Sequence, residues 1–325
     1  MSVSNINFSL WCDFVERDFL NKEFKELLEK KAFNGATSNP AIFKSAFLSS
    51  SAYQKDRVEL KGNNTKIIYE NLAKKDIALA ADILKPLYDS NNDGFVSIEV
   101  DPFLCDDAKA TIDEGKRLFN EIGKTNVMIK VPATKAGYIA MEELMNSGIH
   151  VNATLIFSPD QAKECVEAFQ RASKKVEGSL PKGVISVFVS RFDSKLDDKL
   201  EALNLPVAKT GIYNAIKIYD LIESYSLSNV RTLFASTGVK RDDLEADYYI
   251  KELLFKNSVN TAPLGTIKEF LKSDDLKEIK LTQDYAKYFK TLKENGINIQ
   301  AVYDELMKEG LVSFKDAFNQ ILEEL

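Results

Sequence analysis

A buried β-strand is predicted at residues 127–133, which read VMIKVPA, because apolar and β-branched residues fill the run. Thr134 follows as a candidate N-cap for a helix over 135–147, whose apolar stripe comprises Ala140, Met141, Leu144 and Met145. A second apolar run, VNATLIF, occupies residues 151–157. Strand, helix and strand in this order predict a parallel β-α-β unit.

The same alternation continues in both directions along the chain. Further strands are expected at 9–14 (SLWCDF), 35–39 (GATSN), 94–100 (GFVSIEV), 184–192 (VISVFVSRF), 230–237 (VRTLFAST) and 257–263 (NSVNTAP). The strands at 35–39 and 257–263 rest on their place in this series. Eight strands separated by helical patterns favour a closed (β/α)8 TIM barrel over an open sheet.

Helices are expected in the gaps between the strands, at 17–32, 66–87, 106–122, 211–225 and 242–255. Another begins at Ser158, which forms a capping box with Gln161.

The remainder of the chain, residues 266–325, reads as helical only. Thr282 is a candidate cap for a helix that stops before Gly296, and Ser313 with Asp316 is expected to open the last helix. No Pro/Ser-rich linker interrupts the pattern. The prediction is therefore a single domain over 1–325, with a barrel core at about 9–263 and a C-terminal helical extension at about 266–325.

Charge and composition argue against several classes of partner. The 43 Lys and Arg residues against 49 Asp and Glu residues give a net charge of -6, and no basic run occurs, so no nucleic-acid partner is expected. No apolar run approaches the ~20 residues of a membrane helix, and the N-terminus lacks a secretory pattern, so no membrane partner is expected. Three cysteines without pattern fit a reducing compartment, which predicts a cytoplasmic protein.

Metal and nucleotide chemistry also have no support. His150 is the one histidine, so a three-histidine site is impossible, and the cysteines lack zinc-site spacing. Neither a P-loop nor a G-x-G-x-x-G motif occurs. The chemistry is therefore expected to use carboxylates, hydroxyls, amides and lysines. His150 precedes a strand, at the stability face of a barrel, which predicts a structural or surface role.

Lys130 is the most unusual residue in the predicted strands. Alternation places Met128, Lys130 and Pro132 on one face of the strand and the β-branched residues on the other. If the β-branched face packs under helices, Lys130 points into the barrel. Desolvation makes the neutral amine of an inward lysine available, which is how Schiff-base lysines are activated. The alternative is a lysine that snorkels from a strand edge to water.

Two acids also lie at predicted strand ends. Alternation places Ser97, Glu99 and Asp101 on one face, and an inward carboxylate suits a general acid/base role. The alternative for Glu99 is an ion pair with a lysine of a neighbouring strand. Asp13 ends the first strand, where it suits a catalytic role or the cap of the following helix.

Small polar residues recur on other strands. Thr154 shares a face with Asn152 and Ile156, and Ser186 shares one with Phe188, which suggests a polyol-binding interior or polar fillers of barrel layers. Three further residues follow late strands, where barrels often bind phosphate: Arg191, Ser236 and Lys240. Each of these could instead be a solvated loop residue.

Four motifs in register resemble those of the transaldolase family. They are Gly35-Ala36-Thr37-Ser38-Asn39-Pro40-Ala41-Ile42-Phe43, Ile129-Lys130-Val131-Pro132-Ala133-Thr134, Gly148-Ile149-His150-Val151-Asn152-Ala153-Thr154-Leu155-Ile156-Phe157-Ser158 and Asn260-Thr261-Ala262-Pro263. The resemblance implies a class I Schiff-base transaldolase of the pentose phosphate pathway. Such an enzyme exchanges a dihydroxyacetone unit between fructose 6-phosphate and sedoheptulose 7-phosphate, with erythrose 4-phosphate and glyceraldehyde 3-phosphate as the aldehydes. It needs no metal and no cofactor.

The resemblance also implies a role for each site residue. Lys130 forms the imine, and Asp13 takes the C4 hydroxyl proton. Glu99 and Thr154 handle a catalytic water. The substrate is bound by Asn39, Asn152, Ser186, Phe188 and the phosphate-binding Arg191. Many members have a second arginine after the seventh strand, whereas this chain reads ASTGVK at 235–240. This segment resembles that of longer bacterial members. By this resemblance, Ser236 and Lys240 are expected to bind phosphate.

Three rival functions remain at this point. One is a metal-dependent barrel enzyme, which the small number of histidine and cysteine ligands disfavours, although a carboxylate site is still open to it. A Schiff-base aldolase that releases free dihydroxyacetone would share Lys130. A non-catalytic sugar-phosphate-binding barrel would be expected to have lost the lysine or an acid, and both are present. The expected assembly is a monomer or a homodimer.

Overall fold

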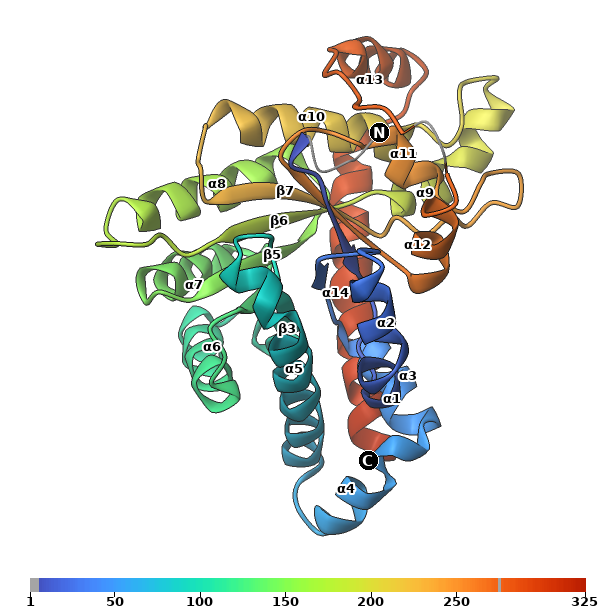
Figure 1. Ribbon diagram of the computed structural model, residues 1–325. Coiled ribbons are helices and arrows are strands. Elements are labelled where there is room, and N and C mark those ends of the chain that lie inside the picture. The colour runs from blue at the N-terminus through green and yellow to red at the C-terminus, as the bar shows by residue number, and fades with distance from the viewer. Residues whose placement is uncertain (1–5, 274–275) are drawn as a thin grey trace.

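The computed structural model describes residues 6–273 and 276–325 as a closed barrel of parallel strands with helices around it (Figure 1). The strands pair in chain order from β1 to β8, and β8 pairs with β1. Their bounds are β1 Ser9–Cys12, β2 Gly35–Ala36, β3 Val96–Glu99, β4 Val127–Pro132, β5 His150–Ile156, β6 Gly183–Phe188, β7 Val230–Ala235 and β8 Ser258–Ala262. Each predicted strand position is therefore confirmed.

Helices follow the strands and also extend the barrel. The helices up to β5 are α1 Arg17–Asn21, α2 Glu23–Glu29, α3 Pro40–Ser49, α4 Gln54–Glu59, α5 Thr65–Asp89, α6 Ala108–Ile122 and α7 Lys135–Asn146. The later helices are α8 Pro159–Ser173, α9 Ser190–Ala202, α10 Thr210–Ser224, α11 Tyr248–Glu252, α12 Leu264–Phe270, α13 Asp284–Glu294 and α14 Ile299–Glu324. Within the described ranges, no helix is long and apolar enough to cross a bilayer.

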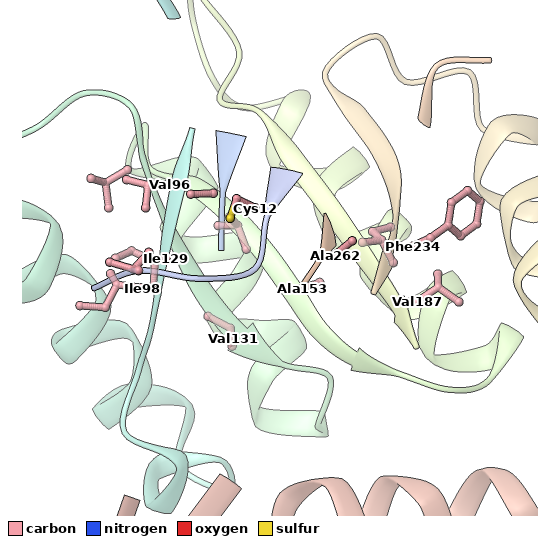
Figure 2. Packing of buried hydrophobic residues seen from close by; sticks show 14 of the residues in the cluster. Cys12, Val96, Ile98, Ile129, Val131, Ala153, Val187, Phe234 and Ala262 are labelled. Carbon is pink, nitrogen blue, oxygen red and sulfur yellow. The ribbon is translucent and has the colours of Figure 1, made fainter. Parts of the chain in front are cut away.

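The two faces of β4 behave as its alternation predicts. Val127, Ile129 and Val131 belong to the cluster that packs between the strands and the surrounding helices, part of which Figure 2 shows. Met128 belongs to a second cluster inside the barrel, together with Trp11 and Val259. The apolar outer faces supply the burial that holds the helices on the sheet, so the polar residues are left on the inner face.

Strand β5 departs from simple alternation at a bulge. Its register with β6 shifts between Ala153 and Ile156, and Leu155 has a left-handed backbone with φ +58°. Ile156 therefore packs in the outer cluster, whereas the prediction places it on the face of Thr154. Leu155 instead joins the interior cluster. A bulge inserts one residue and so reverses the face of those beyond it.

Several predicted boundaries are wrong. β6 ends at Phe188, and Ser190 begins α9, so Arg191 lies in a helix. In the segment 242–255 only α11 is helical. Thr282 does not cap α13; its hydroxyl donates to Asp284, and Gln283 occupies the N-cap position.

The last helix also begins earlier than predicted. Asn298 caps α14, a helix of 26 residues that runs straight through Ser313. Ser313 and Asp316 therefore do not open it. Two predicted caps are confirmed, because Thr134 accepts from the backbone N–H of Gly137, and Ser158 forms a capping box with Gln161.

The N-terminal face of the barrel is closed by polar contacts. Arg231 pairs with Asp93 at 2.8 Å, and the indole N–H of Trp11 donates to the same carboxylate at 2.8 Å. His150 lies at this face: its Nδ1 accepts from the backbone N–H of Lys182 at 2.8 Å, and its Nε2 lies 3.2 Å from the hydroxyl of Tyr88. Burial lowers the pKa of His150 to about 4, so the ring is neutral.

Candidate active site

Lys130 lies inside the barrel near its C-terminal end. The residue is 6 % exposed, and its Nζ donates to the backbone oxygen of Ser38 at 3.1 Å. The ring of Phe314 from α14 lies above it, with its centroid 5.8 Å from Nζ. The side chain therefore does not reach water from a strand edge, and the snorkelling alternative is wrong.

Glu99 faces Lys130 from the neighbouring strand. The two residues are partners in the parallel register of β3 and β4, and Glu99 Oε2 lies 3.6 Å from Lys130 Nζ. This is an ion pair, longer than a hydrogen bond. Burial raises the pKa of Glu99 to about 7, against the opposing effect of the Lys130 charge. The alternative for Glu99 was an ion pair with a lysine of a neighbouring strand, and Lys130 is that lysine.

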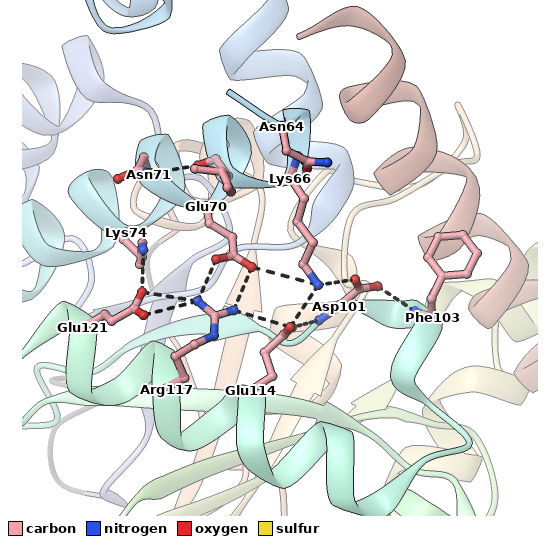
Figure 3. Close-up of polar contacts among 11 residues, drawn as sticks. Asn64, Lys66, Glu70, Asn71, Lys74, Asp101, Phe103, Glu114, Arg117 and Glu121 are labelled. Atoms are coloured by element: carbon pink, nitrogen blue, oxygen red, sulfur yellow. Dashed lines mark hydrogen bonds and ion pairs between the residues drawn. The ribbon is translucent and has the colours of Figure 1, made fainter. Parts of the chain in front are cut away.

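An ion-pair network holds the end of β3, where Glu99 is the last residue (Figure 3). Lys66 on α5 contacts Asp101 at 2.6 Å and Glu114 of α6 at 3.0 Å. Glu114 also accepts from the backbone N–H of Asp101 at 2.6 Å. The strand ends before Asp101, which therefore leaves the face that alternation predicts. These contacts tie the strand end to two helices and so restrict how far Glu99 can move.

The second acid, Asp13, follows the end of β1. The hydroxyl of Thr37 lies 2.6 Å from Asp13 and donates to it. Thr37 has one proton to give, so the hydroxyl of Thr261, also 2.6 Å away, donates to Thr37. Burial raises the pKa of Asp13, while Lys130 and then the Thr37 hydrogen bond oppose this shift. Asp13 does not cap α1, because Glu16 accepts the hydrogen bond from Phe19.

A chain of polar side chains crosses the interior beside Lys130. Ser186 on β6 donates to the amide oxygen of Asn152 at 2.6 Å, and the Asn152 amide donates to Ser97 at 3.1 Å. Asn152 is the register partner of Lys130 on β5. These bonds fix the orientation of the Asn152 amide, which leaves one of its N–H groups for a ligand.

Three buried oxygens near Lys130 have no hydrogen-bond partner among the protein atoms that the structure describes. They are both carboxylate oxygens of Glu99 and the hydroxyl of Thr154. A buried polar group without a partner costs roughly 1–3 kcal/mol, so such groups mark positions where a ligand or a water binds. Glu99 and Thr154 therefore have hydrogen-bonding capacity left for a ligand or a water.

Asn39, Phe188 and Arg191 lie after the carboxyl ends of their strands or at them. Asn39 caps α3 by accepting from Ile42 at 3.0 Å, which leaves its amide N–H groups available. The guanidinium of Arg191 lies over the ring of Phe188 at 5.4 Å, and burial lowers its pKa. Across the described residues no carboxylate lies within ion-pair distance of Arg191. A half-buried guanidinium without an acid is suited to an anionic ligand.

Ser236 and Lys240, which were predicted to form a second phosphate contact, have different surroundings in the structure. Ser236 has a left-handed backbone with φ +54°, and its hydroxyl lies 3.0 Å from that of Ser190, next to Arg191. Lys240 is exposed, and no hydrogen bond within the described chain links it to the other site residues. Arg241 is already engaged by Asp197 and Asp243. Ser236 therefore lies beside Ser190 and Arg191, whereas Lys240 is exposed in the loop after β7.

The sequence interpretation assigned no role to four residues that the structure brings to the site. Thr37 contacts Asp13, and Ser38 contacts Lys130. Both residues lie in the motif at 35–43, and this place was the sequence feature that could have identified them. Ser97 shares the face of Glu99 by alternation. Phe314 had no local signal, because its place over Lys130 depends on the docking of α14.

Comparison with known proteins identifies the family of the chain. The sequence matches the Transaldolase/Fructose-6-phosphate aldolase family over residues 10–325. It is 49% identical over 329 residues to a protein of Campylobacter jejuni subsp. doylei named transaldolase, covering 98% of this chain and 99% of that one. It is 46% identical to a Helicobacter pylori protein of the same name, covering 97% and 98% of the two chains.

One solved structure was also compared with the chain. A crystal structure of fructose-bisphosphate aldolase from Campylobacter jejuni has a TM-score of 0.45 and 9% identity, covering 99% of this chain and 92% of that one. The barrel described above rests on the strand pairing of this chain alone.

Proposed function

Because the chain belongs to the transaldolase/fructose-6-phosphate aldolase family, we propose that it catalyses the transaldolase reaction of the pentose phosphate pathway. The substrates are sugar phosphates. A dihydroxyacetone unit passes from fructose 6-phosphate or sedoheptulose 7-phosphate to glyceraldehyde 3-phosphate or erythrose 4-phosphate, through an imine on Lys130. The observation that carries the proposal is the buried Lys130 amine 3.6 Å from the Glu99 carboxyl group. Burial raises the pKa of this carboxyl group to about 7.

Formation of the imine needs a proton donor and acceptor next to the amine. The neutral amine adds to the ketose carbonyl, and the resulting carbinolamine loses water as the imine forms. A carboxyl group with a pKa of about 7 both gives and accepts protons at neutral pH, which suits Glu99 to this step. The unpartnered hydroxyl of Thr154 is available to orient the water that enters or leaves.

Cleavage of the carbon–carbon bond uses the second acid. Asp13 takes the proton of the C4 hydroxyl, the C3–C4 bond breaks, and its electron pair moves into the imine to give an enamine. The aldehyde product leaves, and the reverse sequence joins the enamine to the acceptor aldehyde. Burial raises the pKa of Asp13, whereas the charge of Lys130 and the hydrogen bond from Thr37 favour the ionised form that a base needs.

The remaining site residues hold the sugar. Asn39, Asn152 and Ser186 bind the hydroxyl groups of the three-carbon unit, and Phe188 lines the site beside them. Arg191 and Ser236 bind the phosphate, because a planar guanidinium offers parallel donors to it. Lys240 contributes a point charge from the loop after β7.

Trapping of the imine tests the proposal. Borohydride is added with fructose 6-phosphate, and the intact mass and the modified peptide are measured. We expect a reduced three-carbon adduct on Lys130 that Lys130→Ala abolishes, while the exposed neighbour Lys135→Ala retains it. Circular dichroism shows that both variants stay folded. An adduct on another lysine, or none in the unmodified protein, contradicts the mechanism.

A product assay separates transfer from simple cleavage. With erythrose 4-phosphate present, a transaldolase forms sedoheptulose 7-phosphate. A family member that acts as an aldolase instead releases free dihydroxyacetone at the same rate with or without the acceptor. We expect the first result, and the second would reassign the chain to aldolase activity.

The setting of the enzyme is also part of the proposal. We place it in the cytoplasm, as a single domain over 1–325 that works as a monomer or a homodimer. The packing of α14 against α3 and β5 supports the single domain, since the extension contacts the barrel itself. Sedimentation tests the oligomeric state, and limited proteolysis tests whether the chain is a single domain.

A further inference from the structure

Helix α14 delivers one aromatic side chain to the interior of the barrel. The helix, red in Figure 1, runs alongside α3. Phe314 is 6 % exposed and belongs to the interior cluster with Met128, Leu155 and Phe188, although it comes from outside the barrel. Its ring faces the Lys130 amine at 5.8 Å. An apolar ring at this position offers the amine no hydrogen-bonding partner and occupies space that water would otherwise fill.

The helix lies very close to the barrel one turn before Phe314. A Cβ atom added at Gly310 would come within 2.9 Å of Leu155 Cδ2, closer than such atoms approach in proteins. Leu155 points inward because of the bulge in β5. Gly310 and the bulge together let the helix lie low enough for Phe314 to reach Lys130.

Contacts on both sides of Phe314 hold the helix in this place. Toward the N-terminal end, the buried hydroxyl of Tyr303 donates to Asn214 at 2.8 Å, and Lys195 of α9 pairs with Glu309 at 2.7 Å. Toward the C-terminal end, the ring of Phe318 meets that of Tyr69 edge-on at 5.0 Å. Phe314 is thus fixed from two directions, and its position does not depend on one contact.

We propose that Phe314 determines whether the enamine on Lys130 is transferred to an acceptor aldehyde or lost to water. This inference rests on the proposed function. In transfer, the enamine carbon forms a bond to the aldehyde carbon of the acceptor. In the competing reaction, the enamine carbon takes up a proton, water adds to the imine carbon, the carbon–nitrogen bond to Nζ breaks, and free dihydroxyacetone leaves. Phe314 suppresses the second course by keeping bulk water, a proton source for the enamine carbon, away from the enamine. Release of the transfer product still uses the water beside Glu99 and Thr154.

The test compares two products from the same enzyme. Sedoheptulose 7-phosphate and free dihydroxyacetone are measured from fructose 6-phosphate with erythrose 4-phosphate at a fixed concentration. We expect Phe314→Ala to raise the ratio of dihydroxyacetone to transfer product by about tenfold. Phe314→Leu keeps an apolar side chain over the amine, and we expect it to stay within about twofold of the unmodified protein.

Phe318→Ala is the matched control. Phe318 is buried on the same helix but contacts Tyr69 instead of Lys130. We expect Phe318→Ala to lower the melting temperature as much as Phe314→Ala and to leave the product ratio unchanged. An equal rise of the ratio in both alanine variants, or no rise in Phe314→Ala, overturns the inference.

Failure of the inference is distinguishable from failure of the proposed function. If the unmodified protein forms no borohydride adduct on Lys130, the proposed function is wrong and the inference falls with it. If the adduct forms and the ratio does not respond to Phe314→Ala, the proposed function stands and the role of Phe314 is wrong.

Discussion

Lys130 and Glu99 are direct register partners on adjacent strands, with 3.6 Å between the ammonium nitrogen and the nearer carboxylate oxygen. Neither group is open to bulk water, and the residues are 6 % and 5 % exposed. The strand register fixes the backbone positions of the two residues, and burial restricts the side-chain rotamers that set the distance between the charged groups. The pair is therefore a fixed amine and acid inside an otherwise apolar and hydroxyl-lined barrel.

Replacing the acid of this pair should slow imine formation. Glu99→Gln keeps the size of the side chain but cannot exchange a proton, so we expect the rate of adduct formation to fall by about 10²–10⁴-fold. Rapid-quench borohydride trapping measures this rate. The variant should still cleave the substrate that has formed an imine. An unchanged trapping rate would show that Glu99 does not move the proton.

Replacing the other acid should affect a later step. Asp13→Asn keeps the acceptor for Thr37 but removes the base, so the imine should form at close to the normal rate while bond cleavage slows by about 10²–10⁴-fold. Trapping should then yield the intact six-carbon adduct in place of the three-carbon one. If Asp13→Asn and Glu99→Gln slow the same step equally, this division of roles is incorrect.

Glu99 should also make stability fall with rising pH. Its pKa is raised to about 7 in the folded protein, against ~4.3 in an unfolded chain. Between these values the folded protein holds a proton that the unfolded chain has released, so the free energy of unfolding decreases as pH rises. We expect Glu99→Gln to remove a decrease on the order of 2–3 kcal/mol between pH 5 and pH 8. Urea unfolding at several pH values gives the comparison, and parallel curves for both proteins would argue against a buried neutral carboxyl.

Arg191 should bind the phosphate of the substrate. Loss of a charge-assisted contact costs about 1.5–3 kcal/mol, so Arg191→Gln should raise KM for fructose 6-phosphate by roughly 10- to 100-fold. Cleavage of unphosphorylated fructose should change little. Lys240→Gln is the comparison, and its effect should be smaller because Lys240 is exposed and its charge is therefore screened by solvent. A larger effect from Lys240 than from Arg191 would reverse this assignment.

His150 should influence stability in acid and not catalysis. Its pKa is lowered to about 4 in the fold, against ~6.5 in an unfolded chain. As pH falls from 6.5 towards 4, the unfolded chain binds a proton at His150 that the folded protein does not bind. The free energy of unfolding therefore decreases. His150→Gln should lose less stability than the unmodified protein between pH 7 and pH 5, by about 2 kcal/mol. Its kcat should be unchanged, since His150 lies at the opposite end of the barrel; an altered kcat would contradict this role.

Local patterns in the sequence determined the architecture and much of the site. Alternation separated Lys130 and Glu99 from the β-branched faces of their strands, because a period of two assigns each side chain of a strand to one face. The order of eight strands placed the ends of those strands at one rim of a closed barrel. The face of each side chain and the rim at which each strand ends follow from neighbouring residues in the sequence and from the parallel order of the strands.

Tertiary packing decided the details that local patterns do not contain. Ile156 changes face because of a bulge, and β6 stops early, so that Arg191 lies in the first turn of α9. Asp101 turns outward because Lys66 and Glu114 draw it to α5 and α6. Each outcome depends on partners distant in sequence, whose hydrogen bonds and charges outweigh the local period.

The contrast is sharpest between Lys130 and Phe314. The sequence by itself predicted that Lys130 lies on the strand face opposite the β-branched residues, and its burial in the structure then excluded the snorkelling alternative. Only the tertiary structure decided that Phe314 covers this lysine, because the residue reaches it through the close approach of Gly310 to Leu155 and the anchoring of α14 at both ends. Such docking is set by shape and burial over long separations in the chain, and no local period encodes it.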